Sequence, residues 1–275
     1  MRSGRDNAEH GWWAGREVLL AVQALVLVVG LVLWEVLSRR HPGGPSLDPF
    51  FFSRPSLIWG RVQQWFTSGF IYRHITITAE EMILAFLIGA ALGIALGFVF
   101  GRSPLVSRIF DPYIKVANAL PRIVLAPIFA LWFGLGVLSK VVFGVTLVFF
   151  IVFFNTYQGV REVDRNIVNN ARMLGATEAD LVRHVLLPSA LSWILSSLRT
   201  SVGFALVGAV VGEYLGAARG LGYVIQQAEG VLDATGVFAG IVVLSAFVLV
   251  VDLVVTVVER RLLVWKPPAA TEEAR

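Results

Sequence analysis

Residues 79–101 read AEEMILAFLIGAALGIALGFVFG, and no charged residue follows Glu81 within this stretch. Its length exceeds the ~18 apolar residues that mark a membrane-spanning helix. The whole chain of 275 residues has the same character, because 56% of it is hydrophobic, its mean hydropathy is +0.74 and only 15% is charged. A typical soluble domain is about 25% charged. This composition excludes a soluble enzyme and predicts an all-α polytopic membrane protein.

Six segments of this kind are expected to cross the membrane. We interpret the first as a retained anchor, because it is too long for a signal-peptide core and lacks an A-x-A cleavage site. The expected spans are Val18–Leu37, Ala79–Gly101, Tyr113–Phe133, Ser139–Tyr157, Leu191–Gly216 and Val237–Glu259. They place a transmembrane domain at residues 18–265, between an N-terminal segment at 1–17 and a polar tail at 266–275 that we expect to be disordered.

The chain between the first two spans predicts a further helix. Pro55–His74 has apolar side chains at helical spacing, which is typical of an amphipathic helix lying in the membrane interface. Trp12 and Trp13, just before the first span, are expected to be interface anchors.

The distribution of lysine and arginine predicts the orientation. With the N-terminus inside, the cytoplasmic segments hold fourteen of the 23 basic residues and the outer segments hold seven. Basic residues are enriched in cytoplasmic loops, so both termini are expected in the cytoplasm. The net charge of +4 and the pI near 9.8 then reflect topology rather than nucleic-acid binding.

The sequence offers no recognisable catalytic or metal-binding pattern. It contains no cysteine, which excludes disulfides and thiolate chemistry. The four histidines are scattered, and we expect each to be solvated or interfacial: His10, His41, His74 and His184. Neither a catalytic residue nor a metal ligand is predicted, and no cofactor is expected to bind this chain.

Four glycines in the second expected span recur at every fourth residue: Gly89, Gly93, Gly97 and Gly101. Glycines at this spacing line one face of a helix and allow the backbone of another helix to approach closely. Packing inside one subunit is favoured over a seam between two subunits.

A polar segment between the fourth and fifth spans is the strongest candidate for function. Residues 159–188 read GVREVDRNIVNNARMLGATEADLVRHVLLP. We predict two short helices joined around Gly175, the first ending near Leu174 and the second beginning after Thr177. Thr177 is a favourable N-cap, and Glu178 in the first turn favours the helix dipole. A compact pair of helices of this shape suits the docking of a soluble partner. Physical reasoning alone gives equal weight to a solvated loop without a partner.

This segment resembles the EAA signature of binding-protein-dependent ABC importer permeases, which reads roughly E-A-A-x-x-x-G and continues, about nine residues later, as I-x-L-P. The match holds at Ala171, Gly175, Leu187 and Pro188, whereas Asn169 and Asn170 replace the Glu and the first Ala.

Further motifs extend the resemblance over about 240 residues, in the order typical of the sulfonate, taurine, nitrate and thiamine-precursor branch. They are ALPR at 119–122, LAP at 125–127, LWFGLG at 131–136, GEYLG at 212–216, GLGY at 220–223 and ERR at 259–261.

The resemblance implies a type I importer permease in a bacterial inner membrane. Two permease subunits, most simply a homodimer, would enclose the pathway, two ATPase subunits would receive the loops at 159–188, and an extracytoplasmic binding protein would deliver the solute. The expected ATPase-coupling residues are Asn169, Asn170, Ala171, Arg172, Leu174, Gly175, Ala176, Glu178, Leu187 and Pro188. ATP and Mg²⁺ would bind the partner, because the nearest phosphate-loop look-alike here, residues 134–140, has the wrong spacing.

Two other classes of membrane protein fit the sequence less well. A secondary transporter, the main alternative, usually has a repeated half and intramembrane carboxylates, and no repeat is evident. A membrane-embedded hydrolase needs paired aspartates, an activated nucleophile or HExxH, none of which is evident.

Polar residues inside the expected spans are candidates for lining the pathway: Asn118, Arg122, Asn155, Glu213 and Tyr214. For Glu213, contact with lipid headgroups is as plausible as a gate role. Arg122 either attracts an anionic solute or pairs with a carboxylate, and we slightly favour pairing.

Depth within the membrane also predicts a structural ion pair. Arg199 and Asp252 lie at similar distances from the same membrane surface, so the two charges are expected to meet, with Arg122 as a competing partner for Asp252. The solute is not determined by the sequence. The resemblance implies one small solute of the sulfonate, nitrate, aromatic-acid or vitamin-precursor type, and residues 208–214, GAVVGEY, lean weakly towards pyrimidine precursors or aromatic compounds.

Overall fold

The computed structural model describes residues 9–39 and 47–262, and every regular element within these ranges is a helix. The elements in chain order are α1 Glu9–Leu37, α2 Pro49–Phe52, α3 Pro55–Thr67, α4 Phe70–Arg102, α5 Pro104–Ala119, η1 Arg122–Val124, α6 Leu125–Phe133, α7 Val137–Arg161, α8 Arg165–Met173, α9 Glu178–Leu181, η2 Val182–Leu186, α10 Leu187–Gly216, α11 Leu221–Gly230 and α12 Ala234–Leu262. Five helices are long and apolar enough to cross a membrane, or six if a bent pair counts as one span.

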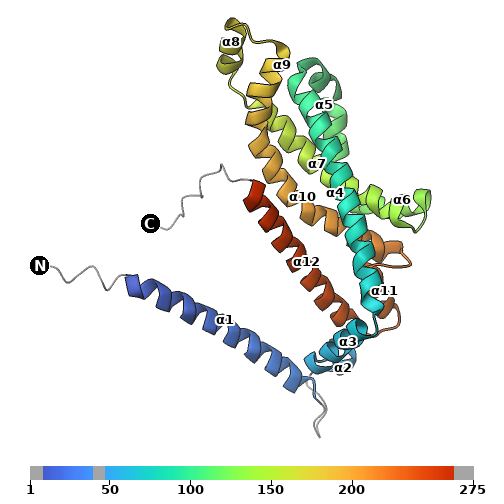
Figure 1. The fold of residues 1–275 in the computed structure, drawn as a ribbon. Coiled ribbons are helices and arrows are strands. Elements are labelled where there is room, and N and C mark those ends of the chain that lie inside the picture. Colours follow the sequence, from blue (N-terminus) through green and yellow to red (C-terminus); the bar gives the residue numbers. More distant parts are fainter. Residues whose placement is uncertain (1–8, 40–46, 263–275) are drawn as a thin grey trace, which may run out of the picture.

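Helices α4, α7 and α10 form the centre of the bundle (Figure 1). Their shared core contains Val148 and Val152 of α7 and Ala205 and Ala209 of α10, all fully buried. At one end of the bundle, α5, α8 and α9 lie together. At the opposite end lie α2, α3 and α11, with α12 packed against α11 and α3.

The four glycines of α4 pack against α7 within the same chain. A Cβ atom added to Gly89 would lie 2.7 Å from the Cβ of Val148, and one added to Gly93 would lie 2.8 Å from the Cβ of Val152. Real Cβ atoms essentially never approach so closely. The predicted role of this glycine face in packing inside one subunit is therefore confirmed.

The third expected span, Tyr113–Phe133, is not one helix. It is divided into α5 and the η1–α6 segment, which are bent by 75° relative to each other. The break lies at Leu120, which has an extended backbone (φ −63°, ψ 131°), immediately before Pro121. A residue before proline is disfavoured in the α conformation, which explains the break. Figure 1 shows α6 projecting sideways from the bundle.

The predicted interfacial helix, Pro55–His74, is also divided. Helix α3 ends at Thr67, the chain turns through Gly69 at φ +77°, and α4 begins at Phe70. His74 therefore belongs to α4 and is only 6% exposed, so its expected solvated or interfacial position is wrong.

Helix α1 extends away from the bundle and meets it near α3 (Figure 1). None of the apolar window within Val18–Leu37 is buried. Glu35 joins the two helices, because its carboxylate accepts hydrogen bonds of 3.0 Å from both the backbone N–H and the hydroxyl of Ser56 in the first turn of α3. The expected tail at 266–275 and residues 1–8 lie outside the described residues.

An ion pair ties α3 to the turn between α11 and α12. Arg61 Nη1 lies 2.6 Å from Asp233 Oδ2, and the other carboxylate oxygen of Asp233 accepts a hydrogen bond from the backbone N–H of Gly236 at 3.0 Å. Burial alone raises the pKa of Asp233, but the hydrogen bonds from Gly236 and Arg61 outweigh it and hold this pKa below its ordinary value.

Candidate functional site

The segment at 159–188 folds as two short helices at one end of the bundle, with the boundaries expected from the sequence. Helix α8 ends at Met173, Gly175 makes the turn at φ +89°, and α9 begins at Glu178. A Cβ atom at Gly175 would meet nothing within 4 Å. The turn therefore requires glycine for its left-handed backbone and not for lack of space.

Helix α9 starts with a reciprocal capping box. The backbone N–H of Asp180 donates to the Thr177 hydroxyl at 3.2 Å, and the backbone N–H of Thr177 donates to the Asp180 carboxylate at 3.0 Å. This arrangement satisfies two backbone donors that the helix start leaves without partners. The cap fixes where the second helix begins.

The second short helix continues into the bundle without a loop. Residues of η2 form a π-helical turn, in which the backbone N–H of Leu187 donates to the carbonyl of Val182, five residues earlier. Pro188 follows and has no N–H to donate to the preceding turn. Helices α9, η2 and α10 are consecutive, so the segment is connected to the central helix α10 through helical backbone alone.

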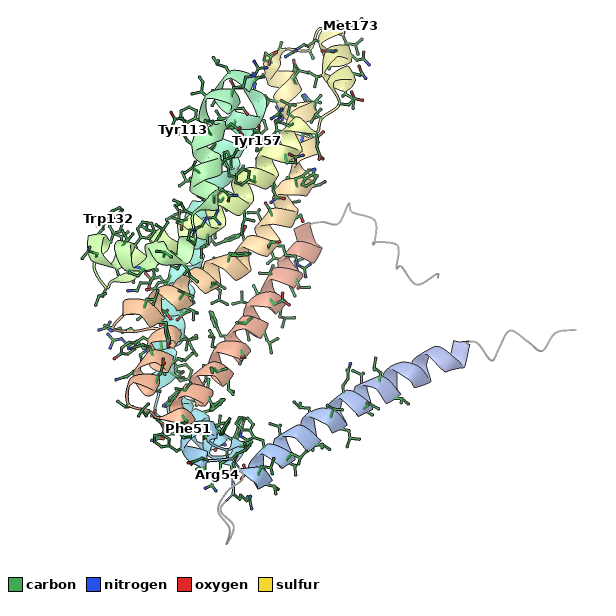
Figure 2. The ribbon with its side chains drawn as sticks, turned by 180° about the vertical axis from the view of Figure 1, so that it is seen from behind. Phe51, Arg54, Tyr113, Trp132, Tyr157 and Met173 are labelled. Atoms are coloured by element: carbon green, nitrogen blue, oxygen red, sulfur yellow. The ribbon has the colours of Figure 1, made fainter. Side chains whose placement is uncertain are left out.

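A glutamate holds the segment against the bundle. Both oxygens of Glu178 on α9 are used, one by Arg172 of α8 at 2.9 Å and the other by Arg102 at the end of α4 at 3.0 Å. The structure thus brings together two of the predicted coupling residues, Arg172 and Glu178, and adds Arg102, which sequence reasoning missed. Met173 lies at the tip of the segment (Figure 2) and is 84% exposed, and the next residue, Leu174, is 88% exposed.

The other predicted coupling residues occupy the same segment. They are Asn169, Asn170 and Ala171 on α8, Ala176 in the turn, and Leu187 and Pro188 at the start of α10. The backbone N–H of Ala176 donates to the carbonyl of Ala171 at 3.0 Å, which closes the turn around Gly175.

A buried polar network lies in the other half of the bundle, and we call it the Glu213 cluster. It joins α4, α7 and α10 to the turn before α11, and its members are His74, Thr78, Glu81, Lys140, Glu213 and the backbone of residues 220–222. Glu213 is 1% exposed and accepts hydrogen bonds from the Thr78 hydroxyl at 2.6 Å and from the backbone N–H of Gly222 at 2.7 Å. Contact of Glu213 with lipid headgroups is therefore excluded.

The same cluster orders the glycine-rich turn before α11. The backbone N–H of Gly220 donates to Nδ1 of His74 at 3.1 Å, and that of Leu221 donates to the Thr78 hydroxyl oxygen at 2.9 Å. Gly220 has φ +117°, and a Cβ atom there would lie 2.1 Å from the carboxyl carbon of Glu213. The turn accepts only glycine at this position, for reasons of both backbone and space.

Lys140 carries the positive charge of the cluster. It is 2% exposed, and its ammonium donates to the carbonyls of Leu135 at 2.7 Å and Gly216 at 2.5 Å. Neither Lys140 nor Glu81 was given a role from the sequence, so sequence reasoning missed both. The available signal was their position as ionisable residues at the margins of apolar spans.

The remaining pathway candidates are spread over the bundle. Arg122 donates to the side chain of Asn118 across the bend between α5 and α6, and its guanidinium lies 4.5 Å from the centroid of the Phe150 ring. Within the described ranges no ion pair of Arg122 with a carboxylate is found, so the favoured pairing is wrong. Asn155 donates to the carbonyl of Ile151 at 2.8 Å, and the hydroxyl of Tyr214 donates to Glu229.

The described residues contain no group of three or more His, Asp or Glu side chains arranged to hold a metal ion. Arg199 lies on α10 and Asp252 on α12, and their pairing stays a prediction.

The profile of the family described as "Binding-protein-dependent transport system inner membrane component" matches residues 89–264, which include the segment at 159–188 and Glu213. The chain belongs to this family. The match begins inside α4, so α1 to α3 lie outside the matched residues.

Curated relatives of the same class match this permease over almost its whole length. It is 31% identical to the putative aliphatic sulfonates transport permease protein of Bacillus subtilis (strain 168), over 97% of this chain and 92% of that protein. It is 33% identical to the formylaminopyrimidine transport permease protein of Halalkalibacterium halodurans, over 88% and 94%. It is 29% identical to the taurine transport system permease protein of Escherichia coli (strain K12), over 92% of each.

Solved structures show that the permease has the type I ABC importer fold. A methionine ABC transporter in an inward-facing conformation matches with a TM-score of 0.54 and 20% identity, over 70% of this chain and 93% of that chain. An amino acid ABC transporter matches with a TM-score of 0.56 and 23% identity, over 72% and 96%. The permease is thus an ABC transporter component of the inner membrane, and the alternative of a secondary transporter is not retained.

Proposed function

We propose that this permease forms the membrane pathway of an ATP-driven importer and couples to separate ATPase subunits through the segment at 159–188. The observation that carries the proposal is the exposed apolar tip of that segment, formed by Met173, which Figure 2 shows at one end of the bundle, and the adjacent Leu174. Large apolar side chains this exposed on a capped, ion-paired element are typical of a protein-binding surface. The permease itself performs no bond chemistry in this scheme.

The connection of the tip to the bundle supports coupling. The segment emerges from α7 and returns through η2 into α10, and these two helices pack closely in the centre of the bundle. A displacement of the tip by an ATPase would therefore be transmitted along helical backbone to the crossing of α7 and α10. The pathway, in our proposal, opens and closes through changes at this crossing.

We further propose that two copies of the permease enclose the pathway, with an extracytoplasmic binding protein docking at the end formed by α2, α3 and α11. One chain supplies five or six spans, and much of the large apolar surface along them is exposed in the single chain. A homodimer with both termini in the cytoplasm is the simplest assembly. Native mass spectrometry of the purified complex tests it: one copy beside a different permease would overturn the homodimer.

The solute is proposed to be a small polar organic compound of the sulfonate, aromatic-acid or vitamin-precursor type, or nitrate. The relatives that support this class transport aliphatic sulfonates, taurine and formylaminopyrimidine. Thermal unfolding of the cognate binding protein in the presence of each compound tests the class. If none of these compounds raises the unfolding midpoint of the binding protein, the proposed solute class is wrong.

Association with the ATPase tests the coupling role directly. Leu174→Asp is expected to abolish co-purification with the ATPase while the permease still inserts and folds, because a charge replaces an apolar contact. Val231→Asp is the matched control, since Val231 is 72% exposed at the opposite end of the bundle. If Leu174→Asp retains the ATPase as well as Val231→Asp does, the coupling assignment is wrong.

A further inference from the structure

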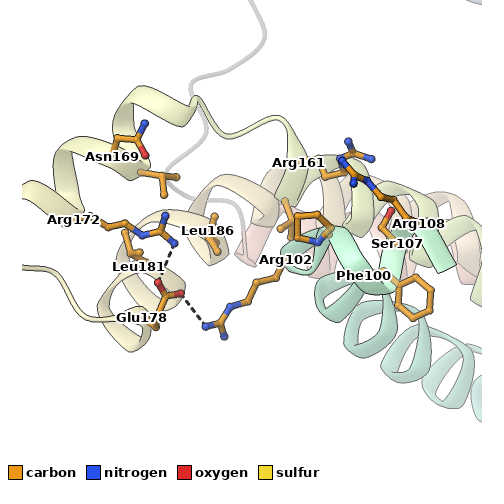
Figure 3. Close-up of a pocket in the computed structure, with 14 residues that line it drawn as sticks. Phe100, Arg102, Ser107, Arg108, Arg161, Asn169, Arg172, Glu178, Leu181 and Leu186 are labelled. Carbon is orange, nitrogen blue, oxygen red and sulfur yellow. Dashed lines mark hydrogen bonds and ion pairs between the residues drawn. The ribbon is translucent and has the colours of Figure 1, made fainter. Parts of the chain in front are cut away.

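A cavity of about 550 Å³ lies behind the segment at 159–188 (Figure 3). Its walls come from the end of α4, the start of α5, the end of α7, and α8, α9 and η2. They belong to two stretches of the sequence, residues 100–108 and 160–186, which the fold brings together. The volume lies within the range of small-molecule binding sites, roughly 300–1,000 Å³.

The charged lining of this cavity is strongly unbalanced. Four arginines line it, from four different helices: Arg102, Arg108, Arg161 and Arg172. Of the described residues that line it, one is acidic, Glu178, and both of its carboxylate oxygens are already bound by Arg102 and Arg172. The lining therefore carries an excess of three positive charges.

Arg108 and Arg161 also line this cavity, and among the described residues neither forms an ion pair with a carboxylate. The guanidinium of Arg161 donates to the hydroxyl of Tyr157, a neutral partner, and the same hydroxyl lies 2.7 Å from Oγ of Ser107. Figure 3 shows Arg108, Arg161 and Ser107 on one side of the cavity and the Arg102–Glu178–Arg172 bridge on the other. Guanidinium groups repel one another unless an anion lies between them.

The rest of the lining suits a phosphate group. Asn169 and Ser107 supply neutral donors, and Leu181 and Leu186 supply apolar walls that reduce competition from water. The planar guanidinium binds phosphate oxygens through two parallel hydrogen bonds, which makes arginine the usual residue for this recognition.

We propose that this cavity binds a phosphate-bearing anion, with Arg108 and Arg161 as its principal ligands and Arg102 and Arg172 completing the shell. The bound anion joins α8 and α9 to α4, α5 and α7, so its presence stabilises the segment against the bundle. The existence of this anion site does not depend on the proposed function. An effect of the bound anion on coupling to the ATPase does rest on the proposed function.

Two sources share this chemistry, a soluble phosphate and the headgroup of an anionic phospholipid, and two arms of one experiment separate them. The full-length permease, without ATPase, is reconstituted in nanodiscs of phosphatidylcholine, and its thermal unfolding is followed with inorganic phosphate against sodium chloride of equal ionic strength. In the second arm the nanodiscs contain one third phosphatidylglycerol and no phosphate is added.

Three variants identify the site. Arg108→Gln removes the charge of one of the two principal arginines, which is exposed. The double change Arg108→Gln with Arg161→Gln removes the charges of both. Arg183→Gln is the matched control, because Arg183 is an exposed residue of η2 that does not line the cavity. Arg108→Gln relieves repulsion, so it should fold at least as well as the parent chain in the absence of anion.

If the cavity binds the anion, the unfolding midpoint should rise in at least one arm, both for the parent chain and for Arg183→Gln. The anion concentration for half of the effect should increase about tenfold in Arg108→Gln, and the effect should vanish in the double variant. A rise with phosphate identifies a soluble anion, and a rise with phosphatidylglycerol alone identifies a lipid headgroup. No rise in either arm, or an equal rise in Arg108→Gln, overturns the site.

Discussion

The hydroxyl group of Thr78 on α4 donates a 2.6 Å hydrogen bond to the buried carboxylate of Glu213 on α10. The same hydroxyl oxygen accepts the backbone N–H of Leu221, and the same carboxylate accepts the backbone N–H of Gly222. One contact between two side chains therefore links two central helices to the start of α11. Its removal leaves buried polar groups without partners on both sides.

Thr78→Val tests this link while preserving the shape of the side chain. We expect a loss of about 1–3 kcal/mol in stability, because the N–H of Leu221 and one oxygen of Glu213 lose a buried partner. Thr76→Val, on the same helix but exposed, is the control and should change stability by less than about 0.5 kcal/mol. Thermal unfolding in detergent measures both, and equal midpoints would show that the link contributes nothing.

Whether a substitution at Gly175 is tolerated should depend on how readily the new residue adopts a left-handed backbone, and not on the size of its side chain. At φ +89° with open space around the Cβ position, Gly175→Asn is expected to preserve association with the ATPase, since asparagine enters the left-handed region at little cost. Gly175→Val should disturb the turn by about 1–2 kcal/mol and weaken association. Co-purification of the ATPase with each variant is the measurement. Equal retention by both would mean that the turn does not position the tip.

The crossing of α7 and α10 depends on two glycines in contact. A Cβ atom on Gly208 would lie 2.5 Å from the Cα of Gly144. Gly208→Ala should therefore separate the helices and cost about 1–3 kcal/mol. Gly203→Ala, on the same helix with nothing within 4 Å, should leave stability unchanged or raise it by up to about 1 kcal/mol. Similar losses in both variants would contradict the close crossing.

The Arg61–Asp233 pair should give stability a dependence on pH. The folded-state pKa of Asp233 lies below its unfolded value, so the pair stabilises the fold above the ordinary titration range of aspartate, and this contribution disappears as pH falls below it. Arg61→Gln should lower the thermal midpoint at pH 7 and change it less at pH 3. A partly exposed ion pair of this kind contributes about 1 kcal/mol to the free energy of unfolding. An equal difference at both pH values would contradict the role of the charge on Asp233.

Arg199 and Asp252 remain a predicted pair, to be tested by a double-mutant cycle. An unpaired charge at their expected depth costs about 2.5–3.5 kcal/mol on insertion scales, so either Arg199→Met or Asp252→Leu should reduce stability in detergent more than both together. Strictly additive losses would show that the two do not interact.

Patterns local in the sequence predicted much of this protein. The apolar runs predicted the membrane helices, and Thr177 and Gly175 predicted the boundaries of α8 and α9, because caps and left-handed turns depend on neighbours within four residues. The glycine face of α4 indicated a close helix contact for the same reason. The break at Leu120 was also encoded locally, before Pro121, although a continuous span was expected from hydropathy.

Only the tertiary structure decided which distant polar residues meet. His74 and Thr78 share α4, but Lys140 and Glu213 lie 62 to 139 positions from them, and no helical spacing or capping pattern in the sequence indicates that these residues meet. The same is true of the four arginines around the cavity, which come from four helices. Composition predicted a membrane protein and the positions of its apolar segments, because burial in lipid acts on each segment independently. The packing of α4, α7 and α10 then determined which buried charges and donors lie within hydrogen-bond distance, because that depends on helix rotation and crossing, which hydrophobicity alone leaves open.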